Sequence, residues 1–249
     1  MRGRVPFRAL VRSEWTKLRT VRSTWWCTAV YLLVVGGAGW LAAASTDTAP
    51  RSDVAVGVAL TGFGIGQLAV LVLGVLAVTT EFASGMALVS LTVAPRRTRL
   101  LLAKTLVVTG YSALLTAVLV VVCAAAAFTL TEVPGGLQLL APEVLRPMGL
   151  QVVDGALVAV LAVALGAVLR STAGAVGVGA ALVFVVPPAL ALWGKELAMR
   201  ASQALPALRV GEDAFLAVST TWPVGLAIVA GWGLAVWLIG AVLIERRDV

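Results

Sequence analysis

The sequence predicts an all-α integral membrane protein, and three observations support this fold class. Hydrophobic residues make up 60% of the 249-residue chain and charged residues only 12%, with a mean hydropathy of +1.01. Soluble domains contain about 45–50% apolar and about 25% charged residues. Six runs of about 20 or more mainly Leu, Val and Ala residues follow one another, which is typical of membrane-crossing helices, and no ten-residue alternation of the β-barrel kind occurs.

The first 23 residues differ from the rest, because they hold seven basic residues and one acid. Their apolar side chains recur at helical spacing and form one stripe: Phe7, Leu10, Val11, Trp15 and Leu18. A basic amphipathic helix with a Trp on its apolar face lies in the headgroup plane of a membrane. A signal peptide is the alternative, but the run that follows is longer than the 7–15 apolar residues of a signal. We therefore expect residues 1–23 to be a retained interfacial elbow helix.

The six apolar runs are predicted to be the crossings of a single transmembrane domain that spans residues 1–249. Each has the roughly 20 residues needed to cross about 30 Å of hydrocarbon at about 1.5 Å per residue. Their predicted bounds are residues 24–44, 54–79, 105–130, 148–169, 171–193 and 223–244.

The distribution of lysine and arginine predicts the orientation. If the N-terminus is cytoplasmic, fourteen basic residues lie on the inner side and five on the outer side. Both termini are then cytoplasmic, and residues 194–222 form the longest extracellular loop. Within that loop residues 197–205 are predicted to be helical up to Pro206, and the loop either re-enters the membrane or lies flat on it. The pI near 10.4 reflects charge that faces anionic lipid, so we expect the lipid bilayer and no nucleic acid as a partner.

The residue types exclude most catalytic chemistry. The chain has no histidine, and its two cysteines, Cys27 and Cys123, lie far apart in apolar runs, where they are expected to be core residues. No phosphate-binding loop of the GxxxxGK[ST] type occurs. We expect neither an enzyme nor a metal or cofactor site in this chain.

One acid, Asp154, lies well inside a predicted crossing, where a carboxylate costs a few kcal/mol unless it faces protein or water. We consider Asp154, with Gln151 one turn away, as lining an outward-facing cavity. The alternative is an interfacial acid that is hydrated from outside or paired with Arg146. Gln67 is the third candidate for a translocation pathway.

Two motifs predict local helix geometry. Gly62 and Gly66 have the GxxxG spacing that lets helix backbones approach closely, either within the chain or between two copies. Pro187 and Pro188 are expected to bend or break the fifth crossing.

The loop between the second and third crossings carries the functional hypothesis. Its predicted helix, residues 81–95, has an apolar face formed by Phe82, Met86, Val89 and Val93. Gly85 leaves room for close approach, and Pro95 ends the helix before the basic residues Arg96 and Arg97. Glu81, where the chain leaves the membrane, is expected to pair with Arg99, Lys104 or a base on a partner. A basic loop that only obeys the charge rule is the simpler alternative, but it needs no apolar face.

These segments resemble one family. Residues 13–20 (SEWTKLRT) with 22–26 (RSTWW) are similar to the N-terminal segment of a family of membrane subunits. These are the six-helix subunits of actinobacterial type in the second bacterial ABC export class. Residues 81–86 (EFASGM), 94–97 (APRR) and 103–104 (AK) resemble its first cytoplasmic loop, and 246–248 (RRD) resemble its tail. Met86 and Ala87 stand where many members have Thr and a further basic residue.

The resemblance implies a permease subunit in the cytoplasmic membrane. Two such subunits, a second copy or a paralogue, form a pore of 12 helices, and separate ABC ATPase subunits bind ATP and Mg on the cytoplasmic side. Closure of the ATPases then pushes on the coupling helix, residues 81–95, and on the interfacial helix, including Lys17 and Arg19. An ATP-independent secondary transporter or channel, and a non-transporting scaffold or immunity protein, are the alternatives.

Overall fold

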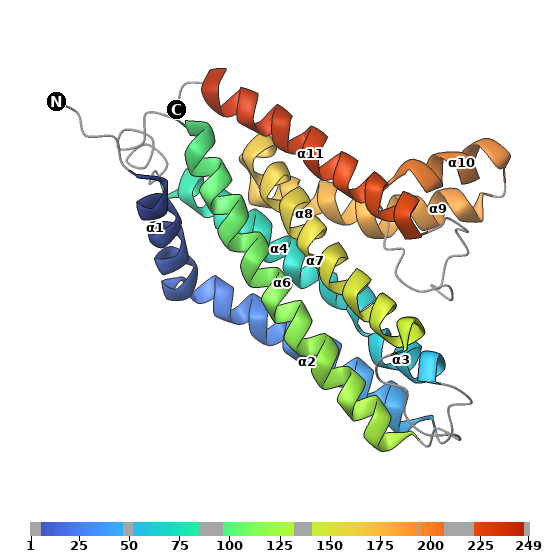
Figure 1. The fold of residues 1–249 in the computed structure, drawn as a ribbon. Coiled ribbons are helices and arrows are strands. Elements are labelled where there is room, and N and C mark those ends of the chain that lie inside the picture. Colours follow the sequence, from blue (N-terminus) through green and yellow to red (C-terminus); the bar gives the residue numbers. More distant parts are fainter. Residues whose placement is uncertain are drawn as a thin grey trace.

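The computed structural model describes residues 6–46, 52–84, 97–131, 141–193, 195–206 and 222–246. All regular elements in these ranges are helical, as the composition predicts (Figure 1). In chain order they are α1 (Phe7–Thr20), α2 (Arg22–Ala44), α3 (Ser52–Leu60), α4 (Phe63–Ala83), α6 (Arg97–Leu130), α7 (Pro142–Leu169), α8 (Thr172–Ala180), the π-helical segment η1 (Ala181–Val185), α9 (Val186–Leu192), α10 (Glu196–Ala204) and α11 (Trp222–Arg246).

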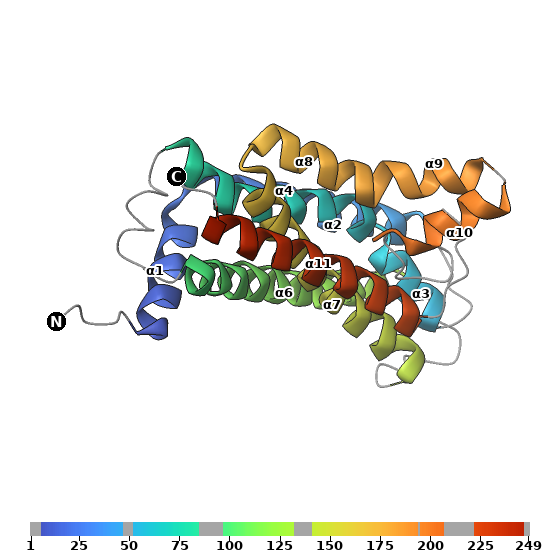
Figure 2. The same cartoon turned by 90° about the horizontal axis from the view of Figure 1, so that it is seen from above.

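Six helical stretches within the described ranges are long and apolar enough to cross a membrane, which confirms the predicted number. They are Arg22–Ala44, Val54–Ala83, Arg97–Leu130, Pro142–Leu169, Thr172–Leu192 and Pro223–Arg246. The stretches run alternately up and down one bundle, while α1 lies across one end of it (Figures 1 and 2). The ends of α4, α7 and α11 and the start of α6 lie at that same end, which we call the α1 end.

Two crossings start earlier than predicted. Helix α6 begins at Arg97 rather than at residue 105, and α7 begins at Pro142 rather than at residue 148. At about 1.5 Å per residue, the 34 residues of α6 extend well beyond about 30 Å of hydrocarbon. Apolar content marks where a helix enters the membrane, whereas its hydrogen bonds continue into the polar region, so these two helices begin before the predicted crossings.

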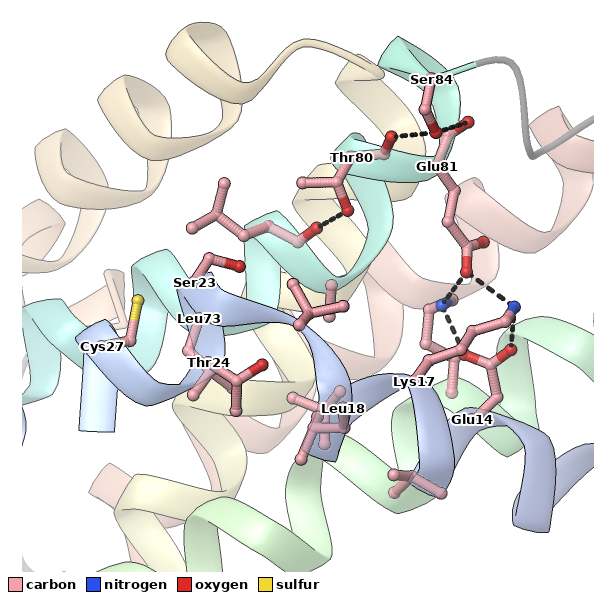
Figure 3. A pocket seen from close by; sticks show the side chains of 16 residues that line it. Glu14, Lys17, Leu18, Ser23, Thr24, Cys27, Leu73, Thr80, Glu81 and Ser84 are labelled. Carbon is pink, nitrogen blue, oxygen red and sulfur yellow. Dashed lines mark hydrogen bonds and ion pairs between the residues drawn. The ribbon is translucent and has the colours of Figure 1, made fainter. Parts of the chain in front are cut away.

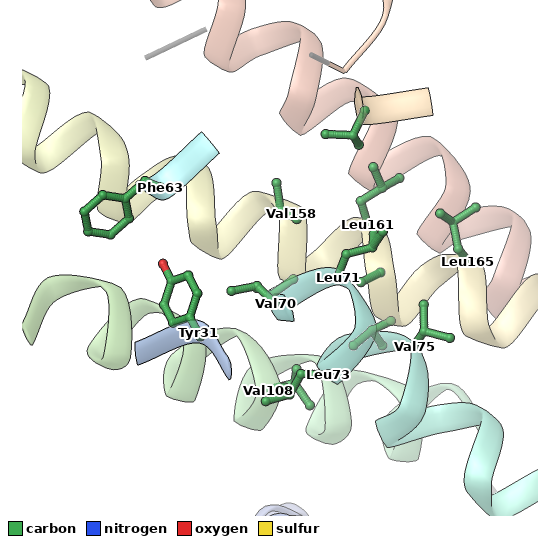
Figure 4. Close-up of a cluster of buried hydrophobic side chains, with 14 of the residues drawn as sticks. Tyr31, Phe63, Val70, Leu71, Leu73, Val75, Val108, Val158, Leu161 and Leu165 are labelled. Atoms are coloured by element: carbon green, nitrogen blue, oxygen red, sulfur yellow. The ribbon is translucent and has the colours of Figure 1, made fainter. Parts of the chain in front are cut away.

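The core lies where α2, α4, α6 and α7 meet, and α7 is the most enclosed of the crossings. Its small side chains, among them Ala159, Ala162 and Ala164, are fully buried, as is Leu161. Figure 4 shows Leu161 and Leu165 of α7 beside Leu71 and Val75 of α4. Helices α4, α6 and α11 all pack against α7.

The predicted second crossing consists of two helices, α3 and α4, which are joined at Thr61 and Gly62. A Cβ added at Gly62 would lie 2.6 Å from the Val35 carbonyl oxygen, and one at Gly66 would lie 2.3 Å from Val35 Cγ2. Both glycines therefore let α4 approach α2, as the GxxxG spacing predicts, and the contact lies within the chain.

The proline pair changes the fifth crossing without ending it. The N–H group of Val186 donates to the carbonyl of Ala181, five residues back, so that η1 forms one π-helical turn before Pro187 and Pro188. Prolines supply no N–H for the α-helical bond, which accounts for this local deviation. Farther along, α10 ends at Ala204 just before Pro206, as predicted, and Trp232 Nε1 of α11 donates to the Ala204 carbonyl at 2.7 Å.

Candidate functional site

Four charged side chains from three helices meet at the α1 end. Glu14 and Lys17 come from α1, Glu81 from the last turn of α4, and Lys104 from the second turn of α6. Lys104 Nζ lies 2.5 Å from Glu14 Oε2 and 2.9 Å from Glu81 Oε1. Lys17 Nζ lies 2.8 Å from Glu14 Oε1 and 2.9 Å from Glu81 Oε1. We call these four residues the charge cluster; Figure 3 shows how three of them converge.

The charge cluster is enclosed to different degrees. The side chains of Glu14 and Lys104 are 3% and 7% exposed, that of Glu81 is 14% exposed, and that of Lys17 is 29% exposed. Removing a charge from water costs several kcal/mol, and only close pairing with further hydrogen bonds compensates for it. Because each carboxylate contacts both ammonium groups, the cluster is satisfied only while α1, α4 and α6 keep this arrangement.

Lys17, on α1, remains charged at neutral pH. Burial lowers its pKa, but its hydrogen bonds and charge interactions with Glu14 and Glu81 outweigh that effect and raise the pKa above the usual 10.5. A group whose pKa is higher in the folded than in the unfolded state stabilises the fold at pH values below its unfolded-state pKa. This contribution is lost only as the pH rises through the folded-state pKa. The pairing of Lys17 is therefore present throughout the neutral range.

The buried face of α1 differs from the predicted stripe in its centre. Leu18 is buried, and Phe7, Leu10 and Val11 are partly buried, but Glu14 lies between them and is more enclosed than any of these three. Trp15 lies at the edge of that face, 38% exposed, with its ring 6.3 Å from the ring of Tyr111. The spacing of residues in the sequence could have revealed this position of Glu14. Glu14 is three residues after Val11 and four before Leu18, so an acid occupies the apolar face of α1. Arg19 is exposed, and its carbonyl accepts a hydrogen bond from Trp25 Nε1.

A second set of contacts ties the α7–α8 turn to the end of α4. Arg170 adopts a left-handed conformation with φ of 52° and ψ of 12°, and it closes α7 through its N–H bond to Gly166. Its guanidinium lies 5.0 Å from the centre of the Phe82 ring. One turn before Phe82 on α4, Thr79 Oγ1 accepts a hydrogen bond of 2.7 Å from Thr172 Oγ1 of α8. Phe82, predicted to face a partner, therefore contacts this chain's own arginine.

Only part of the predicted coupling helix falls within the described residues. Glu81 and Phe82 belong to the last turn of α4 instead of starting a separate helix. The predicted contact residues Gly85, Met86, Val89, Val93, Pro95 and Arg96 lie outside the described residues. Arg97 is the first residue of α6 and donates to the carbonyl of Ile244 on α11 at 3.0 Å.

The three pathway candidates come together inside the bundle. Gln67 Nε2 donates to Asp154 Oδ2 at 2.8 Å, which joins α4 to α7. Gln67 is 0% exposed, and Gln151 and Asp154 are each 3% exposed. Close by, Tyr31 and Thr116 form a hydrogen bond of 3.0 Å between α2 and α6. In this arrangement Asp154 is 3% exposed and accepts a hydrogen bond from Gln67, rather than facing an open cavity. Because Gln67 lies two crossings earlier in the chain, sequence spacing could not identify it as the partner.

We expect the bond between Gln67 and Asp154 to show strong coupling in a double-mutant cycle. Gln67→Leu leaves a buried carboxyl group without its donor, and Asp154→Leu leaves a buried amide without its acceptor, so each should lose roughly 1–3 kcal/mol. The double variant should lose less than the sum, by about 0.5–3 kcal/mol. Thermal unfolding in detergent micelles measures all three, with Asp154→Asn, which retains an acceptor, as the control. Additive losses would contradict the contact.

A groove of about 250 Å³ adjoins the charge cluster between α1, α2, α4 and α6 (Figure 3). Glu14, Lys17, Glu81 and Lys104 line its polar end, and side chains such as Leu73, Ala77 and Val108 line the remainder. This groove could not be predicted from the sequence, because its lining combines the α1–α2 region with residues of α4 and α6 that are far from it in the chain.

Together, the six-crossing bundle and the end-on helix with its charge cluster define a multi-pass membrane protein. Residues 10–188 match the family described as ABC-2 family transporter protein. This match covers most of the chain, so the chain belongs to the ABC-2 transporter family and is a permease-type component of an ABC transporter, not itself catalytic. Such a component works with an ABC ATPase and the bilayer. No curated protein matches the chain.

Proposed function

We propose that the chain is the permease subunit of an ABC exporter, and that it forms the translocation pathway and is driven by a separate ATPase through residues 81–95. The ATPase holds ATP and Mg, and a second permease copy or a paralogue completes a set of 12 helices. The α1 end faces the cytoplasm of a cell whose cytoplasmic membrane holds the complex. The charge distribution supports this orientation, since fourteen of the nineteen basic residues belong to that side.

The charge cluster is the observation that carries the coupling proposal. The segment from 85 to 96 joins the end of α4 to the start of α6, and both of those ends contribute to the cluster. Any displacement of this segment therefore acts on Glu81 and Lys104, and through them on Glu14 and Lys17 of α1. A force on this segment from the cytoplasmic side moves α1, α4 and α6 as one body, because separating these helices would leave the ions of the charge cluster unpaired.

The contact between Phe82 and Arg170 extends this coupling to the other side of the bundle. Phe82 is one residue beyond Glu81, and Arg170 forms the turn between α7 and α8. A cation over an aromatic ring contributes about 0.5–2 kcal/mol. Movement of the end of α4 is thus transmitted to α7 and α8, so that a force applied to one segment reaches these helices as well as α1 and α6. Switching between two arrangements by rigid movement of such packed elements is a known type of transition.

The polar residues Gln67, Gln151 and Asp154 are proposed to line the pathway once the bundle opens. Within the described residues, Gln67 Oε1 and Gln151 Nε2 are buried without a hydrogen-bond partner. Buried groups of this kind lose a favourable interaction that an arrangement open to water or cargo would restore. Asp154→Asn should alter transport of at least some cargoes, and unchanged transport of several cargoes would contradict this role.

The coupling proposal is tested by purifying the tagged chain from its native membrane. We expect an ABC ATPase subunit to accompany it. Gly85→Trp and Phe82→Asp should reduce the recovered ATPase and abolish transport without unfolding the bundle, since both act on the segment that meets the partner. Gly110→Trp is the matched control, because Gly110 is exposed on α6 with nothing within 4 Å of an added Cβ. Full recovery of ATPase with both variants, or purification with no ATPase at all, would overturn the proposal.

A further inference from the structure

The groove beside the charge cluster has a polarity gradient along its length. Its α4 wall runs from Leu73 to Ser84, which is about 16 Å at the rise of an α-helix. The inner part of that wall consists of Leu73, Leu76 and Ala77, and the outer part of Thr80, Glu81 and Ser84. The wall therefore changes from apolar to charged over about half the thickness of the hydrocarbon core.

The groove also lies open to its surroundings along the inner part. Cys27 of α2 and Leu76 and Ala77 of α4 line it and are partly exposed. These residues belong to membrane-crossing stretches, so the medium next to them is the acyl chain region of one leaflet. An apolar groove of 250 Å³ that stayed empty would forfeit the dispersion contacts of its lining.

The outer end of the groove offers a cationic donor. Lys17 has three N–H donors, and within the described residues two bonds go to Glu14 and Glu81. It is also the most exposed member of the charge cluster, with 29% of its side chain accessible. The remaining donor suits an oxygen of a phosphate group, and the basic residues Arg19 and Arg22 nearby on the chain favour an anionic headgroup.

From the polarity gradient of the groove, its opening toward the acyl chains and the cationic donor at its outer end, we propose that it binds one phospholipid of the leaflet at the α1 end. An acyl chain fills the apolar part along Leu73, Leu76 and Ala77, and the phosphate meets Lys17. The site is independent of the ATPase and of the direction of transport. Its effect is to hold α1 against α2, α4 and α6, because the lipid contacts the four helices that border the groove.

Native mass spectrometry of the full chain tests this site. The chain is purified in detergent after reconstitution into vesicles of phosphatidylglycerol and phosphatidylethanolamine. We expect one retained phospholipid per chain, enriched in phosphatidylglycerol. Ala77→Phe, which fills the groove, should lower the lipid-bound fraction at least fivefold. Val121→Phe, at an exposed position on α6 outside the groove, should leave it unchanged. Equal retention in the two variants would overturn the proposal.

Two further measurements keep the test independent of whether Ala77→Phe folds. Lys17→Gln should remove the preference for phosphatidylglycerol, and an unchanged preference would overturn the headgroup assignment. In the unaltered chain, Cys27 lines the groove whereas Cys123 is buried. Added phosphatidylglycerol should slow modification of Cys27 by N-ethylmaleimide at least threefold, with Cys27→Ser identifying the signal. Equal protection by inorganic phosphate would show a free-anion site and overturn the lipid.

Discussion

Replacing Lys104 by Met is expected to cost about 3–5 kcal/mol of stability, the largest loss of any single change considered for this chain. The side chain of Lys104 is 7% exposed, and its ammonium group contacts both Glu14 Oε2 and Glu81 Oε1. Its removal leaves the 3% exposed Glu14 with Lys17 as its remaining described partner. Uncompensated buried charge, rather than lost packing, is the cause, because Met retains most of the side-chain volume.

Thermal unfolding in detergent micelles measures this loss, and Arg99→Met is its matched control. Arg99 lies on the same helix but is exposed, so its replacement should change the melting temperature little. The double replacement Glu14→Met and Lys104→Met should recover part of the loss, since it removes both members of the closest pair. If Lys104→Met melted like Arg99→Met, the charge cluster would not hold α1, α4 and α6 together.

Gly62→Leu is expected to separate α4 from α2. A Cβ at this position lies 2.6 Å from the carbonyl oxygen and 2.9 Å from the Cα of Val35, both of them backbone atoms that cannot rotate away. The two helices must therefore move apart, and overpacking of this kind costs roughly 1–3 kcal/mol or more. The shift also disturbs Tyr31, whose ring lies beside Gly66 and whose hydroxyl bonds to Thr116.

Gly64→Leu is the control for that substitution, because nothing lies within 4 Å of a Cβ at Gly64, which follows two residues later in the first turn of α4. Melting temperatures in detergent should fall clearly for Gly62→Leu and remain near the original for Gly64→Leu. A loss of similar size for both would mean that the change acts on the helix itself and not on its contact with α2.

The sequence was sufficient to predict the elements of the fold but not their mutual contacts. Long apolar runs predict crossings because a membrane offers the backbone no other hydrogen-bond partners. Glycine spacing predicted a close helix approach at Gly62 and Gly66 but not that the partner is α2. Which helix faces which depends on packing among Ala, Leu and Val, and those side chains are too alike along the chain to encode it. The central position of α7 could not be predicted for this reason.

The candidate site was predicted in part. Glu81 was expected to pair with Arg99, Lys104 or a base on a partner, and it pairs with Lys104 at 2.9 Å and also with Lys17. Glu14 was missed as a site residue, although its position on the apolar face of α1 was a usable signal. Gln67 and Asp154 lie 87 residues apart in sequence on two different crossings, so no spacing rule could join them. The contact between Phe82 and Arg170 was not predicted, because an arginine in a distant turn leaves no trace in the sequence near residue 82.

The enclosed position of α7 limits how the chain can change shape. Helix α11 packs on α7 and α6, while α2 and α4 pack on the other faces of the same core. A tilt of α11 relative to α2 must therefore pass through α7 or α6, which lie between them. Ala159 and Ala162 of α7 present little bulk to Gly74 of α4, so this part of the contact allows sliding at low cost, although Leu161 and Leu165 of the same helix are bulky. Bulky replacements at Ala159 or Ala162 should thus trap α7 and its neighbouring helices in one arrangement.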